Sequence, residues 1–343
     1  MIKPWIFEFL YAPDAEGEKI TPAEATAVFD RGIALWQRLE VLGFEGIFFS
    51  EHHFGLSYSP SPNLLIAAIA RLTQRLRLGT MGMVVPLYAP FRVLEEIAML
   101  DHLTGGRLEI GCASGVPQEM IKAGIAAEET RERFAETLEI LDAWLASPVI
   151  SHHGRHYSFD NLRIVPRPLQ EPAPPKWTTV VSPAGAARSA VRRSKICTAF
   201  ESVARVTAMF AAYRGEADRV GFATGPDDFG IRRNVIVAAS EAEAQDKVQV
   251  AKEVTRKVIA GDPRVRAGAS SLLDAKTGFA VHDDDFIAGT PGQVAEQIIA
   301  QCRATGAGHV LAILGRAVDD SRVQAVELFG KAVIPLLRRA EVA

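Results

Sequence analysis

Side chains that can move protons cluster in one short segment, Ser50-Glu51-His52-His53-Phe54. The segment follows an apolar run, which places it at the end of a predicted buried strand. Adjacent residues of an extended chain point to opposite faces, so the two imidazoles do not naturally share an ion, and we predict no metal site. We favour a histidine that contacts a ligand or acts as an acid or base, because imidazole titrates near neutral pH. A histidine packed in the core is the alternative.

Small residues follow two other apolar runs, as Cys112-Ala113-Ser114-Gly115 and as Ser182-Pro183-Ala184-Gly185. The second segment begins a helical pattern, and free amides at a helix N-terminus bind anions where small side chains leave room. Gly115 permits the close approach of a flat ligand, or simply allows a turn. Ser-Pro is also an ordinary helix start. The residues therefore suggest a phosphorylated ligand but leave a plain turn open.

The other histidine and basic clusters indicate surface positions. His152-His153-x-x-His156 lies in a predicted hairpin with no carboxylate or thiol beside it, and His282 precedes three aspartates. The densest basic run comprises Arg188, Arg192, Arg193 and Lys195. We expect this run to cover a solvated helix face rather than to bind nucleic acid.

Apolar runs alternate with helical patterns along the whole chain. Eight of these runs are predicted strands, at 5–10, 46–53, 76–86, 107–115, 176–182, 195–200, 231–240 and 309–315. Because they are apolar almost throughout, they fit a parallel sheet covered by helices. Eight strand–helix units favour a closed (β/α)₈ TIM barrel over a doubly wound sheet, and no G-x-G-x-x-G follows any strand. In such barrels the reacting groups lie at the carboxyl ends of the strands, where the segments above fall.

We predict one α/β barrel domain over residues 1–343, with insertions after the fourth and seventh strands. Residues 151–176 are rich in proline and aromatic residues and predict a small hairpin followed by an extended segment. Residues 261–290 have no sustained period. A loop of that length in a compact domain is usually functional or disordered, so we expect a mobile lid over the ligand.

Charge and composition exclude several classes of protein. The chain has 38 basic and 41 acidic side chains, a formal net charge of −3, and its basic residues are scattered. It offers no field for a nucleic acid backbone, so we expect no nucleic acid partner. Charged residues interrupt every apolar stretch, so we expect no membrane span. Three widely spaced cysteines without C-x-x-C fit a reducing compartment, and we expect a cytoplasmic protein.

Several strings of residues closely resemble a known family, and the Glu-His-His-Phe element together with the turn from Asp101 to Arg107 is the most specific combination among them. The strings are GFEGIFFSEHHFG, TQRLRLGTMGMVVPLYAPFRVLEEIAMLDHLTGGRLEIGCASG, PRPLQEPAPPKWTTVVSP, GTPGQVAEQI and LFGKAVIPLL. From about residue 5 to 338 the chain resembles the bacterial luciferase-like flavin-dependent monooxygenases, with its weakest agreement at 200–290.

This resemblance implies a barrel that binds reduced FMN as a co-substrate, with the phosphate near the fourth and fifth strand–helix turns. Dioxygen would form a C4a-peroxyflavin, which oxygenates a small organic substrate. His52 falls on the catalytic histidine of the family, and Met81-Gly82 on its non-prolyl cis peptide. The predicted cofactor-binding residues are Met81, Gly82, Ser114, Gly115, Ser182, Pro183 and Ala184, and the predicted substrate-binding residues are His53 and Phe54.

The chain departs from the luciferase pattern at the phosphate. Ser114 stands where luciferase has an arginine, and Val181 replaces a glutamate. Ala113 occupies the position of the reactive cysteine of luciferase. Phosphate affinity would then rest on backbone amides and Ser182, and neither light emission nor an aldehyde substrate is implied.

A separate flavin reductase is the expected partner, because the chain has no nicotinamide fingerprint. Deazaflavin-dependent hydride transfer and a noncatalytic flavin-binding protein stay open as alternatives. By analogy with the family we expect a homodimer through the helices predicted at 61–74 and 90–104. The apolar residues expected in that contact are Leu65, Ile69, Ile97 and Met99.

Overall fold

Eight parallel strands close into a barrel in the computed structural model, which describes residues 1–11, 20–55, 57–260 and 281–341. The strands are β1 (Lys3–Glu8), β2 (Gly46–Phe49), β3 (Arg77–Thr80), β5 (Leu108–Ala113), β8 (Lys176–Val180), β9 (Lys195–Thr198), β10 (Phe229–Val237) and β12 (His309–Ile313). Each strand pairs in parallel with the next, and β12 pairs with β1 to complete the ring. The predicted (β/α)₈ barrel is confirmed.

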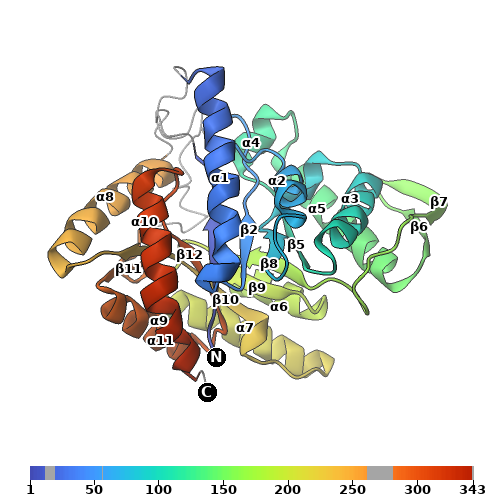
Figure 1. The fold of residues 1–343 in the computed structure, drawn as a ribbon. Helices are drawn as coiled ribbons and strands as arrows, with labels where there is room; N and C mark the ends of the chain where they lie inside the picture. The colour runs from blue at the N-terminus through green and yellow to red at the C-terminus, as the bar shows by residue number, and fades with distance from the viewer. Residues whose placement is uncertain (12–19, 56, 261–280, 342–343) are drawn as a thin grey trace.

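Helices follow the strands and cover the outside of the barrel, as Figure 1 shows. They are α1 (Pro22–Leu42), α2 (Pro62–Ala70), α3 (Pro90–Thr104), α5 (Ala127–Ala146), α6 (Pro183–Val191), α7 (Val203–Val220), α9 (Pro291–Thr305), and α10 (Asp320–Leu328) with α11 (Ile334–Arg339), which a π-helical stretch (Phe329–Val333) joins. Many begin with proline in the first turn, where its missing amide hydrogen costs no hydrogen bond. Among the described residues, no helix has the length and apolar character needed to cross a membrane.

Several elements extend this minimal barrel. They are β4 (Met83–Val84), α4 (Pro117–Lys122), the hairpin β6 (Val149–His153) and β7 (Ser158–Arg163), α8 (Glu241–Ala260), β11 (Phe286–Gly289), and the 3₁₀ turns Val85–Leu87, Pro226–Asp228 and Asp283–Asp285. The hairpin confirms the prediction for 151–176. Most of the expected lid, residues 261–280, lies outside the described residues. The predicted insertion extends too far toward the C-terminus, because its last residues include β11, which pairs with β10.

Aromatic rings fill the inside of the barrel at the amino ends of the strands. The ring of Trp5 stacks on Phe48 at 4.6 Å between centroids, and the edge of Trp177 meets Phe48 at 5.4 Å. Gly46 is required beside them, because a Cβ there would overlap the ring of Trp5 and the carbonyl oxygen of Arg77. These rings fill the barrel at the amino ends of the strands. Room for a ligand is therefore expected at the carboxyl ends of the strands.

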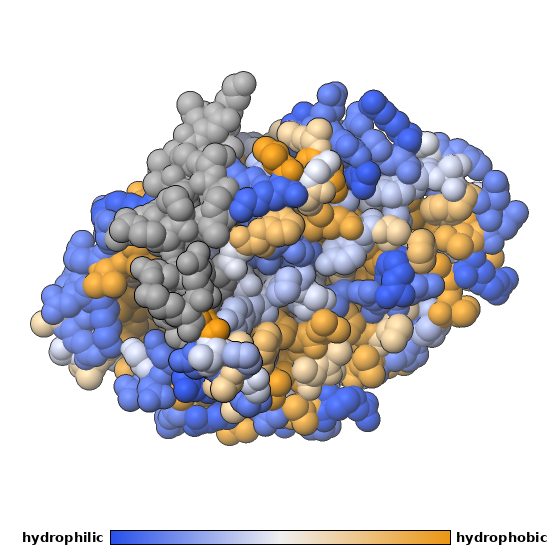
Figure 2. All heavy atoms as spheres, turned by 90° about the horizontal axis from the view of Figure 1, so that it is seen from above, coloured by the Kyte–Doolittle hydropathy of each residue, from blue (hydrophilic) through white to orange (hydrophobic). Residues whose placement is uncertain are grey.

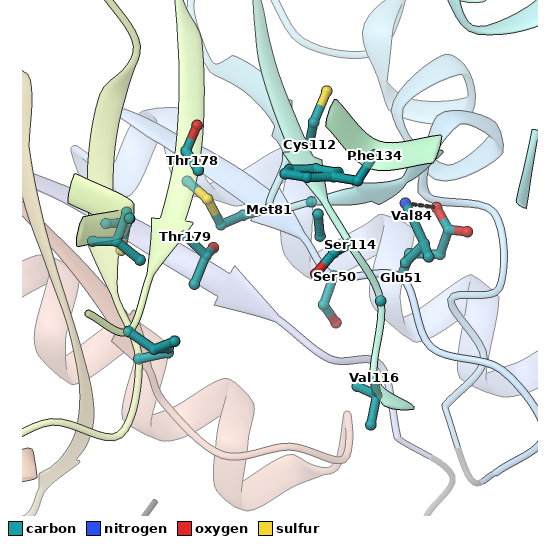
Figure 3. A pocket seen from close by; sticks show the side chains of 18 of the residues that line it. Ser50, Glu51, Met81, Val84, Cys112, Ser114, Val116, Phe134, Thr178 and Thr179 are labelled. Carbon is teal, nitrogen blue, oxygen red and sulfur yellow. Dashed lines mark hydrogen bonds between the residues drawn. The ribbon is translucent and has the colours of Figure 1, made fainter. Parts of the chain in front are cut away.

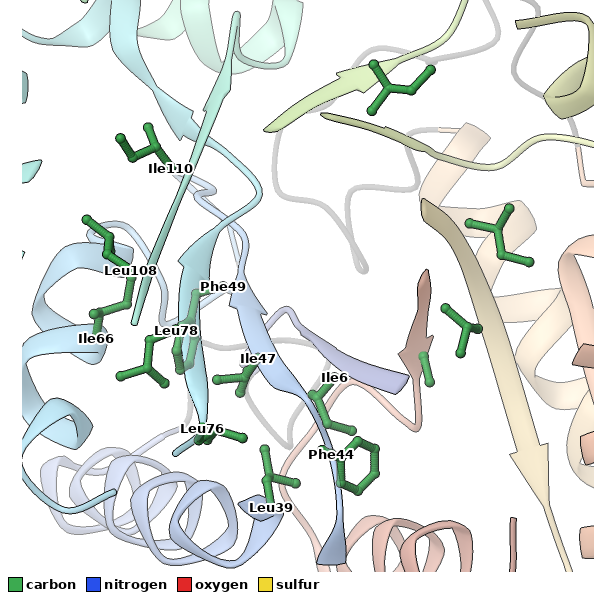
Figure 4. Close-up of a cluster of buried hydrophobic side chains, with 14 of the residues drawn as sticks. Ile6, Leu39, Phe44, Ile47, Phe49, Ile66, Leu76, Leu78, Leu108 and Ile110 are labelled. Atoms are coloured by element: carbon green, nitrogen blue, oxygen red, sulfur yellow. The ribbon is translucent and has the colours of Figure 1, made fainter. Parts of the chain in front are cut away.

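The main hydrophobic core lies between the barrel and the helices. Residues of alternate strand positions point outward, so Ile6 belongs to this layer while its neighbour Trp5 lies inside. Figure 4 shows Ile47 and Leu78 from adjacent strands beside Leu39 of α1. This continuous layer explains why the predicted strands are apolar on both faces.

The exposed apolar side chains of α2 and α3 differ from those expected for a dimer contact. Leu65, Ile69 and Ile97 are buried against the barrel, so their assignment to an outer surface was wrong. Met99 is exposed as expected. The large apolar side chains exposed in this region are Leu64, Leu72, Phe91, Met99 and Leu103.

A buried carboxylate joins the first strand to two helices. Glu8 is fully buried and receives both terminal nitrogens of Arg322 on α10, at 2.9 and 2.7 Å. Trp36 of α1 donates to the same carboxylate at 2.8 Å, and the amide of Leu10 donates at 2.7 Å. The four hydrogen bonds satisfy a charge that burial would otherwise penalise.

We expect Arg322→Met to lower the free energy of unfolding by about 3–5 kcal/mol, because it leaves the charge of Glu8 buried without a cation. Urea denaturation measures this change. The control is Arg38→Met, which breaks the half-exposed pair with Glu327 and should cost no more than about 1 kcal/mol. Equal effects of the two substitutions would contradict the prediction.

Candidate active site

A cavity of about 880 Å³ lies at the carboxyl ends of the barrel strands. Its size is in the range of small-molecule and cofactor sites, about 300–1,000 Å³. Figure 2 looks down on this end of the molecule and shows apolar surface between more polar borders. Six of the ten predicted site residues line the cavity: His52, Met81, Gly82, Ser114, Gly115 and Ser182. His53, Phe54, Pro183 and Ala184 are not in the lining.

The carboxylate of Glu119, from the short helix α4, holds the ring of His52. Its Nδ1 lies 3.1 Å from Oε1 of Glu119, on the short helix α4 after β5. Its ring also stacks on Phe9 at 5.7 Å. Because the carboxylate accepts a hydrogen from Nδ1, Nε2 is left to accept or return a proton. Among the described residues nothing hydrogen-bonds to Nε2.

His53 belongs to a second network, on the other side of the loop. Its Nε2 lies 2.8 Å from buried Glu51, which also accepts from the Tyr88 hydroxyl at 2.9 Å. Glu51 accepts from the Val84 amide as well, at 3.0 Å, as Figure 3 shows. The hydrogen bond to Glu51 raises the pKa of His53. The imidazoles of His52 and His53 therefore contact different carboxylates, and the contact with Glu51 fixes the loop at His53. Phe54 is exposed to solvent.

The wall between β3 and β5 contains the Met81-Gly82 peptide, which is cis as the resemblance implied. Glycine is needed at 82 because a Cβ would lie 2.7 Å from the carbonyl carbon of Cys112. Burial raises the pKa of the Cys112 thiol to about 12, so the thiol stays protonated at neutral pH. Cys112 therefore shapes this wall rather than acting as a nucleophile.

The N-terminus of α6 forms another part of the lining. Ser182 caps the helix, with its Oγ accepting from the Gly185 amide at 3.2 Å. Arg188, one turn further along, lines the cavity and has no hydrogen bond or ion pair with any described residue. Arg131, at the start of α5, is equally unpaired and also lines the cavity.

Arg188 and Arg193 of the basic run are exposed, as expected for a solvated helix face, but part of the run also adjoins the cavity. Arg188 and Arg192 line the cavity, and Arg192 pairs with Asp142. Arg193 lies over the ring of Phe222 instead. A spacing of three residues from Gly185 to Arg188 puts both on one helix face, and this signal was present in the sequence.

Sequence reasoning also missed Glu119, Arg232 and Arg316. Two arginines inside the apolar run IRRNVIV were the signal for Arg232, because a buried strand rarely carries charge without a purpose. No local pattern distinguishes Glu119 or Arg316. Within the described part of the chain, no group of three or more His, Cys, Asp or Glu side chains could hold a metal ion.

The sequence profile of the luciferase-like monooxygenases matches residues 9–309. The chain belongs to this family. The uncharacterized protein y4wF of Sinorhizobium fredii is a relative, 34% identical over 216 residues, which are 62% of this chain and 63% of y4wF. The oxygenase component of a flavin-dependent trigonelline monooxygenase from Acinetobacter baylyi is 33% identical over 46% of this chain and 44% of its own length. The luciferase-like chain thus spans less than two thirds of these relatives.

Solved structures share the fold of this luciferase-like chain at lower identity. Monooxygenase RslO1 from Streptomyces bottropensis has a TM-score of 0.84 at 24% identity, covering 97% of this chain and 99% of its own. The oxygenating constituent of 3,6-diketocamphane monooxygenase from Pseudomonas putida, in complex with FMN, has a TM-score of 0.75 at 20% identity, with 97% and 98% covered. A coenzyme F420-dependent reductase from Methanopyrus kandleri has a TM-score of 0.71 at 18% identity, with 97% and 99% covered.

Proposed function

We propose that this chain is the oxygenase of a two-component FMN monooxygenase, which uses reduced FMN and O₂ to oxygenate a small organic substrate. One observation carries the proposal: a single cavity is lined by the N-terminus of α6, the cis Met81-Gly82 peptide and His52. An anion site, a flat wall and a proton carrier are what a phosphorylated flavin and its oxygen chemistry require. The oxygenase component and the FMN complex among the relatives support the same assignment.

The phosphate of FMN fits the end of the cavity formed by α6. The Ser182 hydroxyl and the free amides of the first turn can donate to phosphate oxygens, and the helix dipole favours a negative group there. Arg188 and Arg131 supply unpaired positive charge beside this turn. They compensate for Ser114, which stands where luciferase has its arginine.

Bound flavin supplies the reaction with O₂, and the chain supplies the surroundings. Apolar side chains such as Phe7, Val84 and Phe134 line the cavity and exclude water from the reacting atoms. Nε2 of His52 takes or returns a proton there, while Glu119 keeps the ring oriented through Nδ1.

A separate flavin reductase completes the proposed system. No nicotinamide fingerprint is found in the sequence, so hydride must reach the flavin elsewhere. We propose a cytoplasmic location for the reaction, which the buried free thiols of Cys112, Cys197 and Cys302 support because free thiols fit a reducing compartment. Fractionation that finds the chain with extracytoplasmic proteins would contradict this placement.

Titration with reduced FMN, oxidised FMN and a deazaflavin tests the cofactor. Reduced FMN should bind most tightly, and Arg188→Gln should weaken binding about tenfold, the effect of one hydrogen bond to a charged group. Arg193→Gln is the control, because Arg193 lies outside the cavity lining. Tight binding of the deazaflavin alone would instead support hydride transfer. Flavin binding without accelerated O₂ consumption would leave only a flavin-binding protein.

His52→Ala should lower product formation by about 10²–10⁴-fold, the usual contribution of a positioned acid or base. FMN affinity and melting temperature should stay close to those of the wild type. A substrate found by screening small organic compounds allows product to be measured for each folded molecule. A lower melting temperature with nearly unchanged turnover would show that His52 only packs the core.

We propose that the chain forms a homodimer through α2 and α3. Leu64 and Phe91 expose apolar surface there that none of the described residues covers fully. Light scattering at micromolar concentration should give about twice the monomer mass, and the double variant Leu64→Glu, Phe91→Glu should be monomeric. The control Val41→Glu, on exposed α1 surface, should remain a dimer. A wild-type mass near 37.2 kDa would contradict the proposal.

A further inference from the structure

Two guanidinium groups line the cavity at a place separate from the N-terminus of α6. Arg232 lies on β10, and Arg316 follows β12. Around the ring of strands, β10 and β12 are separated from the β5–β8 pair by β9 on one side and by β1, β2 and β3 on the other. The cavity therefore has positive charge at a second place, away from the proposed phosphate site.

Within the described part of the chain, Nε and Nη2 of Arg232 and Nη1 and Nη2 of Arg316 have no hydrogen-bond partner. Arg232 is 3% exposed, and these two nitrogens of Arg316 are also buried. Buried polar groups are almost always hydrogen-bonded, and a buried charge without a partner is costly. These nitrogens therefore indicate a ligand that supplies the missing acceptors.

Asp285, whose charge acts on Arg232, already has other hydrogen-bonding partners. Asp285 accepts from the Asn234 amide at 2.9 Å and lies 3.5 Å from Nη1 of Arg233, the neighbour of Arg232 on β10. Burial lowers the pKa of Arg232 to about 10, which leaves the guanidinium protonated at neutral pH. Arg232 is thus a cation that faces the cavity while the acid beside it serves other groups.

Aromatic rings hold both guanidinium groups in place. Arg232 lies over the ring of Phe200, 3.8 Å from its centroid, and Arg316 lies over the ring of Phe9 at 4.7 Å. Stacking on a ring leaves the N–H groups at the edge of the guanidinium free, and that edge matches the two oxygens of a carboxylate. Phe9 also stacks on His52, so the same ring adjoins the proposed proton carrier.

We propose that Arg232 and Arg316 bind the carboxylate of an organic substrate, whose apolar body lies against Phe9 and Phe7 near His52. This inference rests on the proposed oxygenase function, because it assigns the substrate class to the same cavity. The shared chemistry is an anionic oxygen acceptor, and the polar edge of the flavin ring could also supply one. The experiment below separates these two sources.

Binding of benzoate and phenylacetate is compared with that of benzamide and phenylacetamide, using protein saturated with oxidised FMN. Calorimetry and the change in flavin absorbance report the affinity. Each carboxylate should bind at least about tenfold more tightly than its amide, the change expected from one hydrogen bond to a charged group. Arg232→Gln and Arg316→Gln should each abolish this preference while changing FMN affinity less than about twofold. Arg193→Gln, outside the cavity, should change neither quantity.

Equal binding of acids and amides to the wild type would overturn the proposal, whether or not the variants fold. So would weaker FMN binding in Arg232→Gln and Arg316→Gln with an unchanged carboxylate preference, because the guanidinium groups would then serve the flavin. Arg316 is less buried than Arg232, and its variant decides the matter if Arg232→Gln does not fold. A carboxylate preference in protein that binds no flavin would support the anion site and reject the proposed function instead.

Discussion

The buried ion pair between Glu8 and Arg322 fastens the first strand to a helix near the end of the sequence. The site depends on this contact, because it lies beside the place where β12 closes the barrel on β1. The two residues are 314 positions apart, and their contact fastens β1 to α10 where β12 pairs with β1. The backbone carbonyl of Glu8 also accepts from the amide and hydroxyl of Ser50, at 2.9 and 3.0 Å. Ser50 begins the segment that contains His52. Glu8 therefore helps to fasten the barrel and also positions the start of the loop that contains His52.

Two carboxylates then determine the orientation of two adjacent histidines. Glu51 ties His53 to the segment after β3, while Glu119 holds His52 from the helix after β5. Each imidazole has one nitrogen fixed by an acceptor, so the ring cannot turn freely. His52 and His53 consequently differ in role although they are neighbours in sequence. His52 reaches the cavity, and His53 braces the loop.

The distribution of charge in the cavity suggests how a ligand would be oriented. Unpaired cations lie at α5 and α6 on one side and at β10 and the loop after β12 on the other, with apolar and aromatic walls between them. Charged ends and an apolar middle favour ligands with the complementary pattern, because opposite charges attract and the buried Arg232 needs an acceptor. The order of strands around the barrel produces this separation, since β5 and β8 lie across from β12 and β1.

Local patterns in the sequence were enough to predict the barrel, the hairpin after β5 and the strand ends that form the cavity. Burial repeats with the period of an element, so the chain itself reports which residues lie inside. The resemblance added the cis Met81-Gly82 peptide and the choice of His52. Periodicity could not separate Leu65, which is buried, from the exposed Leu64, nor did it find β11, which lies at the end of the stretch without a sustained period.

Only the tertiary structure decided which distant side chains meet. Glu119 reaches His52 across 67 positions, and the exposed Arg188 lines the cavity because of how α6 packs on the barrel. Nε and Nη2 of Arg232 find no acceptor among the described residues, while the nearby Asp285 is engaged by Asn234 and Arg233. The physical reason is that the periodicity of apolar residues describes only which face of its own helix or strand a residue occupies. Contacts between elements depend on how those elements pack, which no local pattern records.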